Sequence, residues 1–156
     1  MLICDILEIK RQDTKGPLLH TLPPEASLAE AIHRMAQFRI GSIVVSRCGE
    51  LLGLLTIREL MAILDAHGGD ALSKTVGDAM NPNPITGQLT DSIDQVCQVM
   101  SENHVSHLPV MEGGRVIAII SLQDVAKANH AACAFENRLL KHYISHWPES
   151  AERVLS

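Results

Sequence analysis

Two short segments of this chain place a hydroxyl three residues before a carboxylate, Thr56-x-x-Glu59 and Ser121-x-x-Asp124. This arrangement is typical of a capping box, in which the two side chains satisfy free backbone groups at a helix N-terminus. A functional interpretation is also open. The exposed N–H groups of a helix start suit a phosphate, and a carboxylate one turn along can accept two hydrogen bonds from a ribose diol. The two interpretations are compatible with each other.

The two segments belong to a longer internal repeat. Residues 27–60 align with residues 92–125 without a gap, at a constant offset of 65, so that Met35 is aligned with Met100. Identities are few, and the agreement is mainly in residue class. An internal repeat has to be interpreted before any other feature, because it determines the architecture.

Each copy is predicted to form a helix, a strand, a glycine-containing turn, a strand and a second helix. Apolar residues at i, i+3, i+4 and i+7 predict the first helix, which Ser27 caps in one copy and Asp91 or Ser92 in the other. The apolar strands suit a sheet covered on both faces. A short extended segment before the first helix of each copy completes a β-α-β-β-α unit. The predicted strands are residues 18–21, 42–46, 51–55, 84–86, 107–111 and 116–120.

The repeat unit begins before the aligned block, because residues 76–80 echo residues 3–7. The first copy then carries an insertion at residues 8–17. Glycines and prolines between residues 66 and 83 indicate a linker. The predicted division of the chain is a first repeat at 1–66, a linker and lead-in at 67–83, a second repeat at 84–128, and a C-terminal helix and tail at 129–156.

Each copy has a lead-in segment, a capped helix, a strand, a glycine turn and an apolar strand that ends in Thr/Ser-x-x-Glu/Asp. Two such copies in tandem resemble a CBS-domain pair, also called a Bateman module, and the likeness covers about residues 3–128. The resemblance implies an α/β (α+β) fold with two tandem β-α-β-β-α CBS repeats related by a pseudo-two-fold axis, plus a C-terminal helix. It also implies a stand-alone regulatory module without a catalytic domain.

In CBS pairs the hydroxyl and the acid contact adenine nucleotides in a cleft between the repeats. The resemblance therefore implies a ligand site in the second repeat and a weaker one in the first, where Glu59 is one methylene longer than the usual aspartate. The residues expected at the site in the second repeat are Thr86, Val105, Ser106, His107, Leu108, Pro109, Ile119, Ser121 and Asp124. Those expected at the weaker site are Thr21, Arg39, Gly41, Ser42, Ile43, Thr56, Arg58 and Glu59.

The base is not expected to stack between aromatic rings, because only 3% of the residues are aromatic. Aliphatic side chains such as Val105, Leu108 and Ile119 are expected to enclose it. His104 and His107 precede a strand, where they could contact phosphate or could be ordinary exposed histidines. Both alternatives remain open from the sequence.

Composition excludes several classes of protein. A hydrophobic content of 46% with 20% charged residues indicates a folded chain. A net charge of −5 argues against a general nucleic-acid binder. No apolar run approaches the ~20 residues of a membrane span, and charged residues interrupt the N-terminus where a signal peptide would be apolar. We therefore expect a soluble, cytoplasmic protein with no membrane partner.

Neither a metal site nor a catalytic site is expected. The four cysteines lack CxxC spacing and are taken as structural or incidental. His142 and His146 have helix-face spacing, but no nearby acid or thiol completes a ligand set. No Ser/His/Asp relay, Walker loop or GxGxxG is present. The chain is thus expected to be neither an enzyme nor a cofactor carrier.

Two apolar stripes predict a homodimer. One, in the tail, consists of Phe135, Leu139, Tyr143 and Trp147. In the helix after Thr56, we expect the sheet to bury the stripe of Ile57, Leu60, Met61 and Leu64, and Ile63 to lie outside it on a second apolar surface.

The predicted function is therefore a regulatory module that binds AMP, ADP, ATP or a related adenine nucleotide and acts on an unidentified protein through a change of shape. The alternative is a dimerisation scaffold that needs no ligand.

Overall fold

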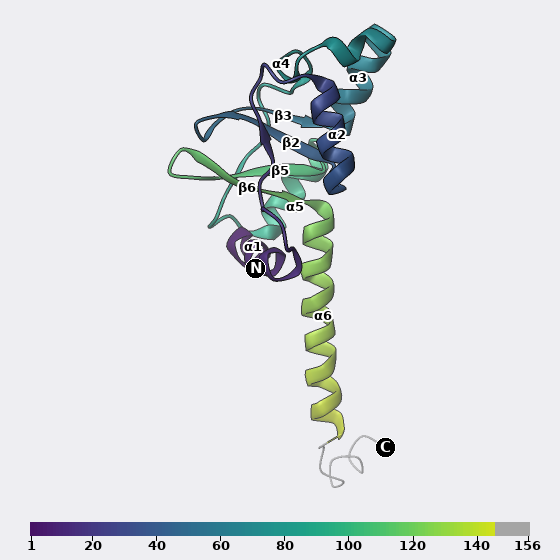
Figure 1. Ribbon diagram of the computed structural model, residues 1–156. Coiled ribbons are helices and arrows are strands. Elements are labelled where there is room, and N and C mark those ends of the chain that lie inside the picture. The colour runs from purple at the N-terminus through teal and green to yellow at the C-terminus, as the bar shows by residue number, and fades with distance from the viewer. Residues whose placement is uncertain (146–156) are drawn as a thin grey trace.

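The computed structural model describes residues 1–145, and two three-stranded sheets form its centre (Figure 1). In each sheet a short outer strand pairs in parallel with the first strand of an antiparallel hairpin. The strand orders are β1-β2-β3 and β4-β5-β6. The sheets pack on each other through the buried side chains of Val44, Leu54 and Val116. The strands are β1 Thr21–Leu22, β2 Ser42–Arg47, β3 Glu50–Thr56, β4 Gly87–Gln88, β5 His107–Glu112 and β6 Arg115–Ser121.

Helices cover the outer faces of the two sheets, so the predicted mixed α/β fold with tandem repeats and a C-terminal helix is confirmed (Figure 1). The outer strands β1 and β4 are only two residues long and begin three residues later than predicted. The helices are α1 Ile3–Asp13, α2 Leu28–Phe38, α3 Ile57–His67, the 3-10 helix η1 Gly68–Ser73, α4 Val76–Ala79, α5 Ile93–Glu102 and α6 Leu122–Ser145.

The duplication extends to backbone detail. Strands β5 and β6 begin and end 65 residues after β2 and β3, and each hairpin has its irregularity at the same place. Arg39 and His104, also 65 residues apart, both adopt a left-handed backbone conformation, with φ of 53° and 54°. The helix caps agree as well, since Ser27 and Ser92 each accept a hydrogen bond from the amide three residues on. The two copies are therefore the same fold built twice.

The lead-in segments cross between the repeats. Helix α1 packs on the second repeat, where Ile3, Ile6 and Leu7 are buried in the same core as α5, β5 and β6. Helix α4 packs on the first repeat, where Val76 is fully buried and its amide donates to the carbonyl of Ala26 at 2.7 Å. Each repeat is thus completed by the segment that precedes the other.

A close backbone approach fixes the position of α1. A Cβ atom at Gly87 would lie 2.7 Å from Cδ1 of Ile3, so the absence of a side chain in β4 makes room for α1. The equivalent residue of the first repeat by strand register is Leu22, which fills its own core. The two cores are consequently filled by different means.

The predicted orientation of α3 is wrong in part, because only Leu60 of the stripe expected to face the sheet is buried. Leu60 and Ile63 are the residues that the core buries, whereas Ile57, Met61 and Leu64 are exposed. Two apolar stripes overlap on this helix, and periodicity alone does not say which one faces the sheet. The side that carries Ile63 faces the core because η1 and α4 pack there with the first sheet.

Helix α6 starts in the body and continues away from it (Figure 1). Its first turns bury Val125 and Ala128, whereas Leu139 and Leu140 further along are exposed. Trp147 and the side chains of Phe135 and Tyr143 lie outside the described residues, so the predicted tail stripe stays a prediction. Within residues 1–145, every helix is too short or too polar to span a bilayer.

Candidate functional site

Both hydroxyl and acid pairs cap a helix, as the sequence predicts. At the start of α6, the amide of Ser121 donates to Oδ2 of Asp124 at 2.8 Å, and the amide of Asp124 donates to Oγ of Ser121 at 3.2 Å. At the start of α3, the amide of Thr56 donates to Oε2 of Glu59 at 2.8 Å, and its hydroxyl donates to the same oxygen. The longer side chain of Glu59 therefore reaches back to both groups of its cap residue.

The start of α6 opens into a hollow of about 420 Å³ between the repeats, here called the Ser121 hollow. Seven residues expected at a ligand site line it, and both repeats contribute: Arg39, Gly41, Ser42, His107, Ile119, Ser121 and Asp124. Nine further residues complete the lining: Lys10, Thr14, Gly16, Pro17, Leu18, His20, Phe38, Ile40 and Gln123.

The start of α3 faces a second hollow of about 120 Å³, here called the Thr56 hollow. Its expected members again come from both repeats: Gly41, Thr56, Arg58, Glu59, Val105, Ser106 and His107. The others are Leu54, Ile57, Asn81, Pro84, Ile85 and His104. Each helix start therefore shares its hollow with the beginning of a strand of the other repeat, so each hollow combines residues that were expected at different sites. The cause is the packing of the two hairpins on each other.

Five of the expected residues do not reach either hollow. Ile43 and Leu108 are buried in the two cores, and Pro109 is buried in β5. The carbonyl of Thr21, in β1, accepts a hydrogen bond from the guanidinium of Arg34. Thr86 lines a separate hollow beside α5.

His107 is common to both hollows and its ring lies against Gly41. A Cβ atom at position 41 would be 3.0 Å from Cε1 of His107, so a side chain there would push the ring back by a few tenths of an ångström. Nδ1 lies 3.0 Å from the hydroxyl oxygen of Ser106. Burial lowers the pKa of His107, Asp124 and Glu59 oppose that shift, and Lys10 adds to it. The imidazole is therefore neutral at neutral pH.

Lys10 is a residue of the Ser121 hollow that the sequence reasoning missed. Its ammonium donates to Oδ2 of Asp124 and to the carbonyl of Ile119, both at 2.8 Å. Both charged side chains are largely shielded from water, with 19% of Lys10 and 16% of Asp124 exposed. The available signal was the insertion at residues 8–17, which lies next to this hollow but has no counterpart in the other repeat.

Two rings also line the Ser121 hollow, although the chain has few aromatics. The rings of His20 and Phe38 have centroids 4.8 Å apart at an interplanar angle of 39°. Burial lowers the pKa of His20, and the charges of Arg34 and Lys10 lower it further. A low aromatic content did not predict this pair, because composition does not say where the few rings lie.

Within residues 1–145, no group of three or more His, Cys, Asp and Glu side chains is placed to hold a metal ion. His146, one half of the His142 pair, lies outside the described residues. The chemistry that the described hollows offer is hydrogen bonding, positive charge and apolar contact.

The family model described as CBS domain matches the chain twice, at residues 14–66 and 76–131. Among curated proteins, the chain is 28% identical to the CBS domain-containing protein YhcV of Bacillus subtilis over 115 residues, which are 74% of this chain and 81% of that protein.

Solved structures with the same fold include a CBS-domain containing protein of Agrobacterium tumefaciens, with 32% identity and a TM-score of 0.76 over 83% of this chain and 99% of that one. Another is a CBS domain pair crystallised with 5′-methylthioadenosine and S-adenosyl-L-methionine. It has 25% identity and a TM-score of 0.69 over 85% of this chain and 98% of its own.

Proposed function

The chain belongs to the CBS domain family as a tandem pair, and on that premise we propose that it is a regulatory module that binds an adenine nucleotide. The ligand class is AMP, ADP, ATP or a related adenine nucleotide, and the site is the Ser121 hollow. The role is regulatory and not catalytic. The nucleotide acts as a signal, and no bond in it is made or broken.

The observation that carries this proposal is the placement of Asp124 in a hollow of suitable size. Small-molecule sites usually measure about 300–1,000 Å³, and the Ser121 hollow, at about 420 Å³, falls within that range. The Thr56 hollow, at about 120 Å³, falls below it. The two capping boxes are alike in sequence, but only one opens into a space that could take a nucleotide without rearrangement.

The groups around this hollow suit the parts of a nucleotide. Oδ1 of Asp124 accepts no hydrogen bond within the described part of the chain, so it can accept from a ribose hydroxyl. Ile119 and Phe38 offer apolar contact to a base. The related CBS pair that was crystallised with two adenine-containing ligands supports an adenine base as the ligand class.

The signal would be read out as a change of shape. A ligand in the Ser121 hollow would touch α1 and β6 on one side and the segment between α2 and β2 on the other. It would therefore favour one relative position of the repeats, but only by as much as it binds that position better. A partner protein that recognises this position would sense the nucleotide.

A second candidate, a dimerisation scaffold, is favoured by the outer face of α3. Ile57, Met61 and Leu64 are exposed there together, and Leu122 is exposed at the start of α6. We propose that this face forms a homodimer. The dimer is compatible with nucleotide binding, so the two candidates differ only in whether a ligand is needed.

The proposed compartment is the cytoplasm. Cys4, Cys48 and Cys97 are free thiols, as is usual for proteins kept in reducing surroundings.

The test of the function is whether the purified protein binds an adenine nucleotide at all. The protein is denatured and the released small molecules are identified by mass spectrometry, and the ligand-free protein is then titrated with AMP, ADP and ATP by calorimetry. We expect saturable binding of at least one of them. Absence of binding by all three, with a folded protein, would leave the scaffold as the function.

A further inference from the structure

The Ser121 hollow contains a positively charged group that the internal repeat did not provide. Lys10 is on α1, which has 11 residues, whereas its counterpart α4 has four. Ile3, Ile6 and Lys10 follow at intervals of three and four residues and so share one helix face. Because Ile3 and Ile6 are anchored in the core of the second repeat, the additional turns of α1 bring Lys10 to the rim of the hollow.

The ammonium of Lys10 is held by acceptors inside the hollow. It donates to Oδ2 of Asp124 and to the carbonyl of Ile119, and both distances are 2.8 Å. An ammonium has three donors, so one remains for another acceptor. The carboxylate that is proposed to bind ribose is therefore already bonded to a cation, and any ligand of Asp124 must share it with Lys10 or displace it.

The two hollows differ in charge. Lys10 and Arg39 bring two positive charges to the Ser121 hollow and Asp124 one negative charge. In the Thr56 hollow the charges of Arg58 and Glu59 cancel. The chain as a whole has a net charge of −5, so a hollow with a positive surplus is a local exception. Without Lys10, the surplus in the Ser121 hollow would disappear.

We propose that Lys10 is the residue that makes the Ser121 hollow select phosphorylated adenosine over adenosine. This inference rests on the proposed function. A nucleoside that shares Asp124 with Lys10 offers the ammonium no charged acceptor of its own. A nucleotide offers a phosphate oxygen to the remaining N–H of Lys10, and such charge-assisted bonds are among the strongest hydrogen bonds.

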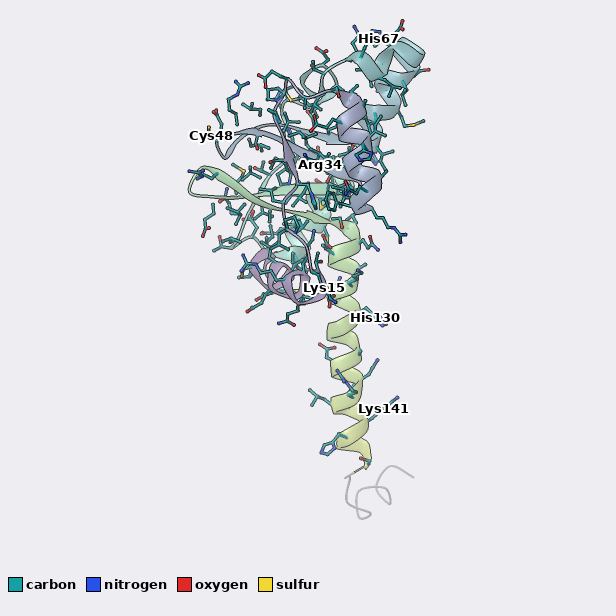
Figure 2. All side chains as sticks on the ribbon, in the orientation of Figure 1. Lys15, Arg34, Cys48, His67, His130 and Lys141 are labelled. Carbon is teal, nitrogen blue, oxygen red and sulfur yellow. The ribbon has the colours of Figure 1, made fainter. Side chains whose placement is uncertain are left out.

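The test compares two ligands that differ only in phosphate. AMP and adenosine are titrated by calorimetry into wild type, Lys10→Met and Lys15→Met. Methionine keeps the apolar stem of the lysine. Lys15 follows α1 in the same insertion, is exposed and does not line the hollow, so its replacement is a matched control for charge (Figure 2).

We expect Lys10→Met to lower the ratio of AMP to adenosine affinity by about tenfold or more. AMP binding should weaken and adenosine binding should stay the same or improve, because Asp124 has lost its competing partner. Lys15→Met should keep the wild-type ratio. An unchanged ratio in Lys10→Met, or equal losses for both ligands, would overturn the proposal.

Two further results separate this inference from the function on which it rests. If wild type binds neither ligand nor any other adenine nucleotide, the proposed function fails and the selection by Lys10 fails with it. If Lys10→Met does not fold, Lys10→Arg and the salt dependence of wild type replace it. Arginine should preserve the ratio, and added salt should weaken AMP binding but not adenosine binding. A salt response shared by both ligands would contradict the role of Lys10.

Discussion

The two hollows share two residues, Gly41 and His107, and of these only His107 has a side chain. Its ring lies against the backbone of Gly41, where an added Cβ atom would be in tight contact with it. A shift of the ring toward one hollow would change the other. Its neutral state at neutral pH also keeps a third positive charge out of the Ser121 hollow.

The stability of the protein should depend on this histidine as pH falls. Because burial lowers the pKa of His107 in the folded state, the unfolded chain takes up its proton first, near pH 6.5. The contribution to stability is therefore present above pH 6.5 and is lost as pH falls through the lower pKa of the folded state. We expect His107→Gln to lose less unfolding free energy than wild type between pH 7.5 and 5.5.

Urea unfolding at several pH values measures this difference, and His33→Gln on the exposed face of α2 controls for the loss of one histidine. Parallel pH profiles of wild type and His107→Gln would show that the burial of His107 does not affect its protonation.

The polar residues of the hollows were predictable to different degrees. The spacing of Ser121 and Asp124 predicted that they meet at a helix start, and the resemblance to CBS pairs implied that this helix start belongs to a ligand site. Lys10 could not be predicted, because its partner lies 114 residues away and only the packing of α1 brings the two together. Leu108 was expected beside a base but is buried in the core, since period-two alternation does not say which side of a strand faces a ligand.

At the scale of elements, the sequence predicted the strands and helices well and their contacts poorly. Strands β2 and β5 begin where predicted, because apolar runs and glycine turns are local signals. The exchange of α1 and α4 between the repeats is not local. It depends on contacts between segments far apart in the sequence, such as Ile3 with Gly87 and Val76 with Ala26.

Helix α3 gives the prediction that belongs to this scale. Met61 is 62% exposed on the proposed dimer face, whereas Ile63 is 8% exposed and belongs to the core. We expect Met61→Asp to convert a dimer to a monomer without unfolding it, because a charge would be buried only in the interface. Ile63→Asp should unfold the first repeat instead, so it is not a test of the dimer.

Gel filtration with light scattering at micromolar concentration measures the mass, and circular dichroism checks the fold of each variant. A wild-type mass near the 17.0 kDa of one chain would refute the dimer. A Met61→Asp variant that remains dimeric would show that the interface is on another face, such as the one with the exposed leucines of α6.

At the scale of the molecule, the duplicated fold creates two hollows that are related by symmetry but differ in content. The crossed packing places each helix start in a hollow with the start of a strand of the other repeat. The unpaired insertion then gives only one of them a lysine. The repeat made the pseudo-symmetry predictable, and the departures from the repeat, Glu59 and the insertion at 8–17, mark where the two sites differ.

The central claim is that an adenine nucleotide binds in the Ser121 hollow, and a comparison of Asp124→Ala with Glu59→Ala tests it most directly. The two residues occupy equivalent positions of the two copies and each accepts a hydrogen bond from its cap residue. The nucleotide that wild type binds is titrated into both variants by calorimetry, and thermal unfolding checks that both are folded.

Loss of a charged acceptor for the ribose should cost about 1.5–3 kcal/mol, which is roughly ten- to more than a hundredfold in affinity. We predict this loss for Asp124→Ala and a near wild-type affinity for Glu59→Ala. Equal affinities of wild type and Asp124→Ala, or a loss confined to Glu59→Ala, would contradict the account.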